Sequence, residues 1–304
     1  MDLLEQHEIF ELLPTHGKVV TLDADLPMKH ALAALAAHGA SALPVWDSAL
    51  QRFVDVFSSS DLVDILLFAH RTLTSTAGGN TESALDHCHL RDLSGLKRSK
   101  PPGFLMACVD DSLAHGASML ASHGLECLPV GDGACSSSLL HLLLPEQIVL
   151  FLATLPEFSA GYAGLLEQPV GQALLPLCRP LKTVHRNTSL IDALALLSAE
   201  RIDALPIVDD AGSMQDAIAC RDVRQLASPS AMELGMPLHE AMRLIEGPPR
   251  VHSCKVTDTV ASAIVRLASS EVSQLMCLNE SDTVCAVITP STILAALVPH
   301  QSQQ

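Results

Sequence analysis

The sequence predicts an α/β fold built from four copies of one small α+β unit. The first observation is a short apolar phrase with Leu-Pro at its centre, which occurs three times and then once in a weaker form: 42–47, 127–132, 204–209 and 274–279. The second is the order of segments around the phrase, namely a short strand, an apolar helix, the Leu-Pro strand, a turn, a second strand and another helix. A unit of about fifty residues cannot bury its apolar faces alone, so the copies are expected to pack in pairs.

The first copy shows this order most fully. Residues 19–22 are expected to form a short strand, and 25–38 a helix, because apolar side chains recur at helical spacing from Met28 to Leu35. Gly39 is expected to end that helix. The remaining predicted elements are a strand over 42–45, a turn over 47–49, a strand over 53–57, and a helix that opens at 58–61 and continues over 62–69.

The third and fourth copies repeat the pattern. In the third we expect a helix over 188–199, strands over 204–208 and 217–220 with a turn at 209–212, and a helix over 222–227. In the fourth we expect a helix over 260–269, strands over 273–278 and 284–288, and a helix over 292–297.

Composition favours a folded, reduced protein that binds neither nucleic acid nor membrane. Of 304 residues 48% are hydrophobic, which suits two domains, and the formal charge of −16 disfavours nucleic acid or an anionic membrane as a partner. The apolar run 139–155 is interrupted by Pro145 and Glu146, so a strand followed by a helix is expected there rather than a membrane span. The nine cysteines include no CxxC pair and no signal peptide precedes them, so we expect reduced thiols and a cytoplasmic location, with a nuclear one left open.

The repeats and the stretches between them define the predicted domain organisation, in which two consecutive halves of the chain hold two copies each. The predicted boundaries are an N-terminal segment 1–17, repeat 1 at 18–70, a linker 71–103, repeat 2 at 104–155, a linker 156–180, repeat 3 at 181–228, a linker 229–249, repeat 4 at 250–298 and a tail 299–304.

The unit resembles the cystathionine-β-synthase (CBS) domain, whose tandem pairs form Bateman modules, and the match covers nearly all of 18–298. Within that group the chain resembles the gamma regulatory subunits of the AMP-activated or sucrose-nonfermenting-related protein kinase family. The strings that carry this narrower resemblance are 35–47 with its Trp46, 51–54, 61–66, 147–158, Glu271-Val272 and 293–297.

The resemblance implies a non-catalytic subunit with two Bateman modules packed as a flat disk. It further implies assembly with a kinase alpha subunit and a scaffolding beta subunit, and the apolar residues of 3–13 are expected to dock on the beta subunit. The sequence holds no glycine-rich phosphate loop, GxSxG or HExxH, which agrees with a chain that is not an enzyme.

In this family an aspartate at the start of a repeat's last helix holds the ribose hydroxyls of an adenine nucleotide, since one carboxylate can accept both protons. The first repeat keeps this residue as Asp61, preceded by Ser58, and the third keeps it as Asp222. The second repeat has Gln147 instead, and the fourth has Thr292, a weaker acceptor. The alternative is that Asp61, Asp222 and Thr292 are helix N-caps, a position that these residue types favour without any ligand.

The basic residues that meet the nucleotide phosphate in the family are missing. The corresponding positions hold Ser41, Glu126-Cys127, Asp203-Ala204 and Ser273-Gln274, and a further basic pair is replaced by Glu146-Gln147. A charge-assisted hydrogen bond contributes about 1.5–3 kcal/mol, so the loss of two weakens binding about a hundredfold to ten-thousandfold. We therefore expect weak or absent binding of AMP, ADP or ATP, and an uncharged adenosyl ligand or none in their place.

Other polar clusters leave alternatives open. His87-Cys88-His89 has metal-capable side chains, but adjacent positions seldom converge on one ion, so a loop and no metal site are expected. His185-Arg186 and Arg221 with Arg224 are candidates for substitute phosphate contacts or for solvated and salt-bridged side chains. Two other functions also stay open: a stand-alone CBS-pair sensor of an adenosyl ligand, and a ligand-free CBS scaffold.

Overall fold

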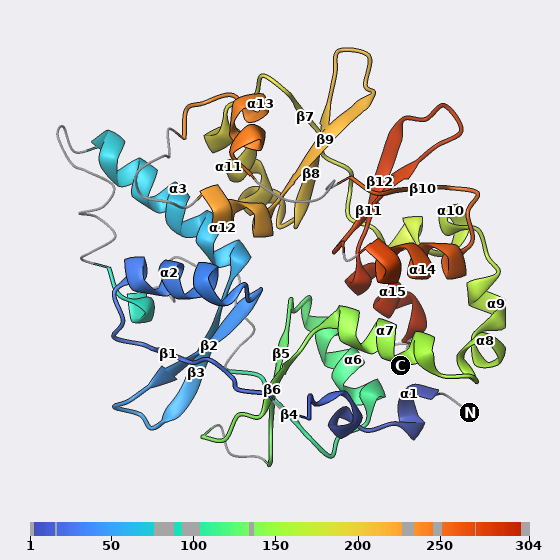
Figure 1. Cartoon of the computed structure of the whole chain (residues 1–304), viewed down its shortest axis with the longest axis horizontal. Helices are drawn as coiled ribbons and strands as arrows, with labels where there is room; N and C mark the ends of the chain where they lie inside the picture. Colours follow the sequence, from blue (N-terminus) through green and yellow to red (C-terminus); the bar gives the residue numbers. More distant parts are fainter. Residues whose placement is uncertain are drawn as a thin grey trace. The chain divides into compact units, whose positions relative to one another are not determined.

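The computed structural model describes residues 3–15, 17–75, 88–92, 104–133, 137–226, 234–245, 251–270 and 272–298. His87, Glu271, the basic stretch 97–100 and the tail 299–304 lie outside the described residues. The described helices and strands form four groups in chain order, one for each predicted repeat (Figure 1).

Each repeat contains a three-stranded sheet in which the Leu-Pro strand is central. The first strand runs parallel to it and the third antiparallel. The strands are β1 (Leu22–Asp23), β2 (Ala42–Asp47) and β3 (Arg52–Ser58); β4 (Ala107–Cys108), β5 (Leu128–Gly131) and β6 (His141–Leu143); β7 (Val184–His185), β8 (Ala204–Val208) and β9 (Met214–Ala219); and β10 (Ser253–Lys255), β11 (Leu275–Leu278) and β12 (Val284–Ile288). This central place explains why the phrase begins with mostly apolar residues, because its first four residues are buried in all four copies.

The proline of the phrase limits the first strand. Proline has no N–H to donate to a neighbouring strand, and in the first three repeats the parallel pairing begins only at the residue after it, as in the pairing of Leu22 with Val45. In the fourth repeat Met276 replaces the proline, its N–H donates to the carbonyl of His252 at 2.8 Å, and β10 is one residue longer. The predicted strand over 19–22 is therefore wrong in extent, since only Leu22 of it pairs.

Two helices accompany each sheet, one between the parallel strands and one after the third strand. They are α2 (Met28–His38) and α3 (Ser59–Ser75); α6 (Leu113–His123) and α7 (Pro145–Thr154); α11 (Leu190–Glu200) and the 3-10 turn η4 (Cys220–Asp222) with α12 (Val223–Leu226); and α14 (Val260–Ser270) and α15 (Pro290–Leu297). Gly39 ends α2 in the left-handed region at φ 59°, as predicted. The run 139–155 forms β6 and α7, and no helix among the described residues is long and apolar enough to span a membrane.

Four short segments outside the repeat pattern, which we call straps, each add an isolated antiparallel bridge at the residue before a repeat's first helix. The bridges join Glu8 to Ser112, His89 to Pro27, Pro169 to Thr259 and Pro237 to Ser189. The straps contain α1 (Leu3–Gln6) and η1 (Ile9–Leu12); η2 (Leu90–Asp92); α8 (Phe158–Gly161), α9 (Ala163–Leu166), α10 (Val170–Ala173) and η3 (Leu175–Leu177); and α13 (Leu238–Ala241) and η5 (Met242–Leu244). Stretches predicted to be linkers therefore contribute structure to the repeats.

The chain forms two compact units that combine alternate repeats. Unit 1 comprises residues 1–19, 105–181 and 249–304, and thus holds the second and fourth repeats; unit 2 comprises 20–104 and 182–248, and holds the first and third. The prediction of two consecutive halves is therefore wrong for the packing units. The physical reason is that the apolar faces of the helices after the third strands pack across these alternate pairs.

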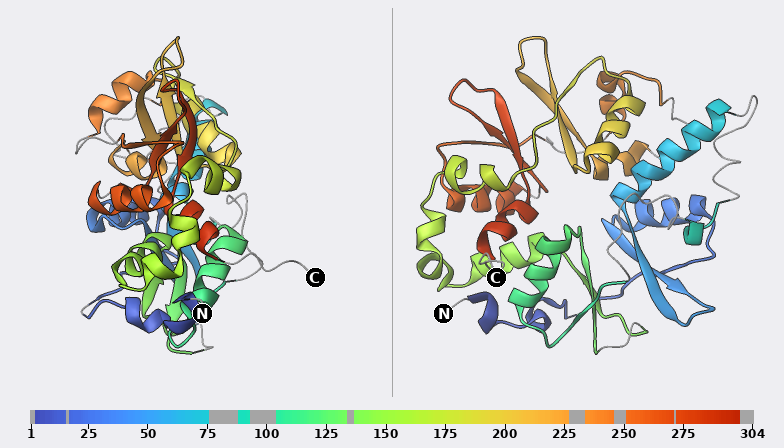
Figure 2. Two further views of the ribbon diagram at one scale, coloured as in Figure 1. Left: turned by 90° about the vertical axis from the view of Figure 1, so that its right-hand side faces the viewer. Right: turned by 180° about the vertical axis from the view of Figure 1, so that it is seen from behind.

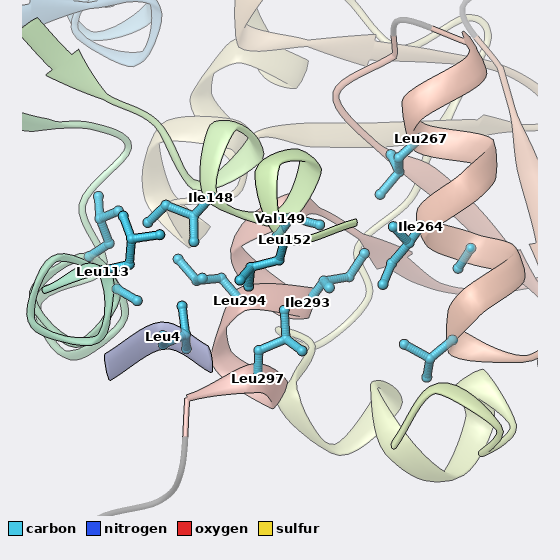
Figure 3. Close-up of a cluster of buried hydrophobic side chains, with 14 of the residues drawn as sticks. Leu4, Leu113, Ile148, Val149, Leu152, Ile264, Leu267, Ile293, Leu294 and Leu297 are labelled. Atoms are coloured by element: carbon cyan, nitrogen blue, oxygen red, sulfur yellow. The ribbon is translucent and has the colours of Figure 1, made fainter. Parts of the chain in front are cut away.

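Figure 3 shows the core of unit 1, where side chains of α7 meet those of α15. Ile148, Val149 and Leu152 on α7 are at most 2% exposed, as are Leu294 and Leu297 on α15. In the view from behind, the same helices lie against each other, α7 in green and α15 in red (Figure 2). Burial of each such side chain stabilises the unit by about 1.5–3 kcal/mol.

Unit 2 has two clusters. One lies within the first repeat, where Met28 and Leu35 of α2 pack on Phe57 of β3. The other joins α3 to α11 and α12 of the third repeat, and within it the hydroxyl of Ser198 donates to the carboxylate of Asp64.

The packing of the N-terminal strap limits which residues of the predicted docking segment 3–13 can meet a partner. Leu3, Leu4 and Ile9 are 6%, 0% and 0% exposed because they pack in the core of unit 1, so they are not available to a partner. Phe10 differs, since 63% of it is exposed.

Candidate functional site

The candidate ribose-binding residues occupy one equivalent place in all four repeats. Asp61, Gln147, Asp222 and Thr292 are each the third residue of the helix that follows the repeat's last strand. In every copy the side-chain oxygen accepts a hydrogen bond from the backbone N–H three residues earlier. These residues therefore stand at the third helical position and not at the predicted N-cap, and from there their side chains accept the backbone N–H at the start of the helix.

Asp61 makes the most extensive of these contacts. Its Oδ2 accepts from the backbone N–H of Ser58 at 2.8 Å and from the Ser58 hydroxyl at 3.2 Å. The Ser58 hydroxyl also lies 2.9 Å from that of Ser60. Both Asp61 and Ser58 are only 7% exposed, so the pair predicted from the sequence is brought together at a buried helix start. A carboxylate there also interacts favourably with the helix dipole.

Asp222 holds the same position with a simpler partner. Its Oδ2 accepts from the backbone N–H of Ala219 at 2.9 Å, and the residue is 8% exposed. Ala219 has no hydroxyl, so the bond from the Ser58 side chain in the first repeat has no counterpart here. The two aspartates therefore resemble each other in backbone geometry and differ in the hydroxyl beside them.

The second and fourth repeats use neutral groups at this place. Gln147 Oε1 accepts from the backbone of Leu144 at 3.0 Å and lies 3.2 Å from Nε2 of His141. Thr292 and Thr289 cap each other, with their hydroxyls 3.1 Å apart and the Thr292 N–H donating to the Thr289 hydroxyl at 3.2 Å. Neither side chain can act as an anionic acceptor of two ribose hydroxyls.

The residues expected on the phosphate side lie beside these helix starts in two repeats. The carbonyl of Ser41 accepts from Ser59 N at 3.1 Å, and the carbonyl of Asp203 accepts from Cys220 N at 2.9 Å. Asp203 is thereby fixed beside the helix that carries Asp222, and its side chain is exposed. Glu126, the matching residue of the second repeat, is exposed too. Acidic groups at these places raise the cost of bringing a phosphate near.

The other polar candidates have local roles. His185 Nε2 lies 3.0 Å from Asp210 Oδ1, while its Nδ1 accepts from the N–H of Asn187, so the ring makes local hydrogen bonds on both sides. Cys88 is half-buried, and burial raises the pKa of its thiol. Among the described residues no group of three or more His, Cys, Asp or Glu side chains could hold a metal ion.

The last residue of the sequence phrase has a structural role that the sequence argument missed. Asp47 Oδ1 accepts from two backbone N–H groups of the hairpin turn after it, and Asp209 Oδ1 and Asn279 Oδ1 do the same in the third and fourth repeats. Asx turns of this kind require a short side chain with an oxygen. The recurrence of Asp or Asn at the end of the phrase could have predicted this role.

Comparison with known proteins agrees with the repeat analysis. The family model of the CBS domain matches residues 10–67 and 173–227, which cover most of the first and third repeats. The second and fourth repeats have the same strand order and pairing. The chain therefore contains CBS domains.

Among curated proteins the chain is similar to gamma subunits of 5'-AMP-activated protein kinase. It is 26% identical over 310 residues to the subunit of Dictyostelium discoideum and 27% identical over 307 residues to gamma-3 of Homo sapiens, with 98% of this chain covered in both. The chain spans 52% and 60% of the length of these two relatives. The resemblance noted in the sequence is confirmed over nearly the whole chain.

Two solved structures share the fold over almost their whole length. One is a Methanocaldococcus jannaschii protein that is described as a proposed archaeal homologue of the AMPK gamma subunit. It superposes with a TM-score of 0.74 at 13% identity, and the match covers 94% of this chain and 98% of that one. An uncharacterised conserved protein of Pyrococcus horikoshii gives 0.56 at 15% identity, with 96% and 100% covered.

Proposed function

We propose that this CBS-domain chain is a non-catalytic, gamma-type regulatory subunit of a heterotrimeric AMP-activated or sucrose-nonfermenting-related Ser/Thr protein kinase. The observation that supports this most is the similarity to gamma subunits over 98% of the chain, together with four repeats in this chain that share one strand order. A kinase alpha subunit supplies catalysis and a beta subunit the scaffold. The chain biases the kinase between active and inactive arrangements, and a ligand or partner shifts that balance by binding one arrangement more tightly. The cytoplasmic location and the disk-like packing of the modules stay predictions.

Affinity purification of the chain from its native source tests the assembly. The expected result is co-purification of a Ser/Thr kinase catalytic subunit and a beta-type subunit in similar amounts. A stable species that never contains a kinase or a beta subunit would contradict the proposal.

Docking of the beta subunit on the N-terminal strap depends on Phe10, because the neighbouring apolar residues are buried in the chain itself. Phe10→Ser is expected to weaken beta-subunit binding without lowering the melting temperature. Leu50→Ser is the matched control, since Leu50 is 56% exposed and lies in the first repeat. Equal effects of the two variants on the beta subunit would rule out the strap as the docking site.

For the ligand, we propose that Asp61 and Asp222 are the ribose-binding residues and that nucleotides bind weakly or not at all. Both carboxylates are buried at helix starts, where Oδ2 of each accepts a backbone N–H. A carboxylate is the side-chain group that can accept two ribose hydroxyl protons at once. The acidic Asp203 beside the third repeat's site opposes a phosphate group. An uncharged adenosyl ligand therefore suits these sites better than AMP.

Calorimetric titration with AMP, ADP, ATP and adenosine separates these outcomes. The variants to use are Asp61→Asn and Asp222→Asn, because an amide oxygen can still cap the helix while the anionic acceptor is lost. We expect adenosine to bind at least as tightly as AMP and each variant to weaken it. Tight AMP binding that both variants leave unchanged would refute the site assignment.

A second function is favoured by one observation. Exposed carboxylates of Glu126 and Asp203 occupy positions where the family carries phosphate-binding residues, which suits a ligand-free CBS scaffold. Absence of heat and of thermal stabilisation with every nucleotide, together with a bound kinase, would identify the chain as a gamma-type scaffold whose regulation comes from its partners.

A further inference from the structure

Four cysteine thiols gather around the sheet of the fourth repeat in unit 1. Cys254 on β10 and Cys277 on β11 are buried, whereas Cys178 and Cys285 are half-buried. The Cys285 thiol donates to the Cys277 carbonyl at 3.3 Å. The eight cysteines that the structure describes are all free thiols.

Cys254 and Cys277 have the geometry that a disulfide requires. They are register partners on neighbouring parallel strands, so their side chains leave the sheet on the same face. Adjacent strands lie about 4.7–4.9 Å apart, and disulfides accept Cα separations of about 4.4–6.8 Å. The spacing of the two strands therefore lies within the Cα range that a disulfide accepts.

The two thiols interact directly. A hydrogen bond from the Cys277 thiol to the Cys254 sulfur lowers the pKa of Cys254 and raises that of Cys277. A lowered pKa favours the thiolate of Cys254, which is the form of a cysteine that reacts.

Access to the pair is through the edge of the sheet. The two sulfur-bearing residues are 1% and 0% exposed, so a large oxidant cannot reach them in the closed state. However, β10 is a three-residue strand at the edge of the sheet, and local opening of an edge strand brings its buried side chains into contact with solvent. A small oxidant can then meet Cys254.

We propose that Cys254 and Cys277 are a redox-active dithiol that closes to a disulfide when hydrogen peroxide reaches the edge of this sheet. The Cys254 thiolate attacks a peroxide oxygen, the O–O bond breaks, and Cys254 sulfenic acid and hydroxide form; the hydroxide takes up a proton to give water. The Cys277 sulfur then attacks the sulfenic sulfur, the S–S bond forms, the S–O bond breaks and a second water leaves. Two thiols lose two electrons and one peroxide becomes two waters.

Peptide mapping of the peroxide-treated full chain tests this. The reduced protein is oxidised, its remaining thiols are alkylated after unfolding, and trypsin is added without reductant. Trypsin cuts after Arg250, Lys255 and Arg266, and no Lys or Arg follows Arg266, so the disulfide joins peptide 251–255 to peptide 267–304. We expect this linked pair, which disappears on treatment with a dithiol reductant.

Variants assign the partners, since peptide 267–304 also carries Cys285. The linked pair should persist in Cys285→Ala and in Cys220→Ala, a buried cysteine of the third repeat, and be lost in Cys277→Ala and Cys254→Ala. Unchanged circular dichroism shows that the variants fold. Loss of the link in Cys285→Ala, or full alkylation of Cys254 and Cys277 after peroxide treatment, would overturn the proposal.

Discussion

Removal of the Asp61 carboxylate should destabilise unit 2 more than removal of the equivalent neutral group destabilises unit 1. Asp61 accepts a buried backbone N–H at 2.8 Å, and a hydrogen bond to a charged group contributes about 1.5–3 kcal/mol. Its place in the first helical turn adds about 0.3–1 kcal/mol through the helix dipole. For Asp61→Ala we therefore expect a loss of about 2–4 kcal/mol.

The measurement is urea unfolding followed by circular dichroism, with two matched variants. Asp61→Asn keeps a capping oxygen and should lose only about 1 kcal/mol. Gln147→Ala removes a neutral acceptor at the equivalent position of the second repeat and should also lose about 1 kcal/mol. A stability of Asp61→Ala within about 0.5 kcal/mol of the unsubstituted chain would refute the reasoning, because that is the range of ordinary surface substitutions.

Three further substitutions test the packing, the electrostatics and the turns. Leu152→Ala should cost about 2–5 kcal/mol in urea unfolding because the side chain is fully buried, whereas Leu150→Ala on the same helix should cost far less, since Leu150 is 38% exposed. The Ser48 hydroxyl donates to Asp23 and lowers the pKa of that carboxyl, so Ser48→Ala should raise this pKa in an NMR titration. Because a depressed carboxyl pKa stabilises the fold above the unfolded-state pKa, the variant should lose less stability than the parent as the pH falls through that range. Asp209→Ala should cost about 1 kcal/mol in thermal unfolding, since its oxygen caps two backbone N–H groups of a hairpin turn.

The sequence predicted the second and third strands of the repeats better than the first strands. The strands over 204–208 and 284–288 have the predicted bounds, because a continuous apolar run between turn residues is a strong local signal. The first strand was predicted too early, at 19–22, because its extent depends on a proline more than twenty residues away rather than on its own residues. Such pairings are set by tertiary structure.

The candidate site, too, was predicted where local sequence determines the structure and missed where distant residues determine it. Residue type and spacing located Asp61, Asp222 and Thr292 at helix starts, and the structure places all three there. Whether such a residue stands at the N-cap or three residues later depends on where the preceding strand ends, which the sequence leaves open by a few residues. The contact of Asp203 with the third repeat's helix joins residues that only the folded strand brings together.

The straps depend most on tertiary structure, and the N-terminal strap offers the sharpest test. Its backbone bonds join Ile9 N to the Asp111 carbonyl at 2.9 Å and Leu113 N to the His7 carbonyl at 2.8 Å, across about a hundred residues of sequence, a separation that no local pattern reports. Leu4 and Ile9 are fully buried, and each contributes about 1.5–3 kcal/mol.

Deletion of residues 2–12 should therefore lower the stability of unit 1 by roughly 5 kcal/mol, with the buried Leu3 included, and leave the core of unit 2 intact. Hydrogen exchange followed by mass spectrometry measures both units in one sample. The control variant is Glu5→Ala, because Glu5 is an exposed residue of α1 in the same strap. A deletion that leaves protection of α6 and α7 unchanged would show that the segment is a free docking arm after all. Faster exchange confined to unit 1 would establish instead that the chain completes its second repeat with residues that precede its first.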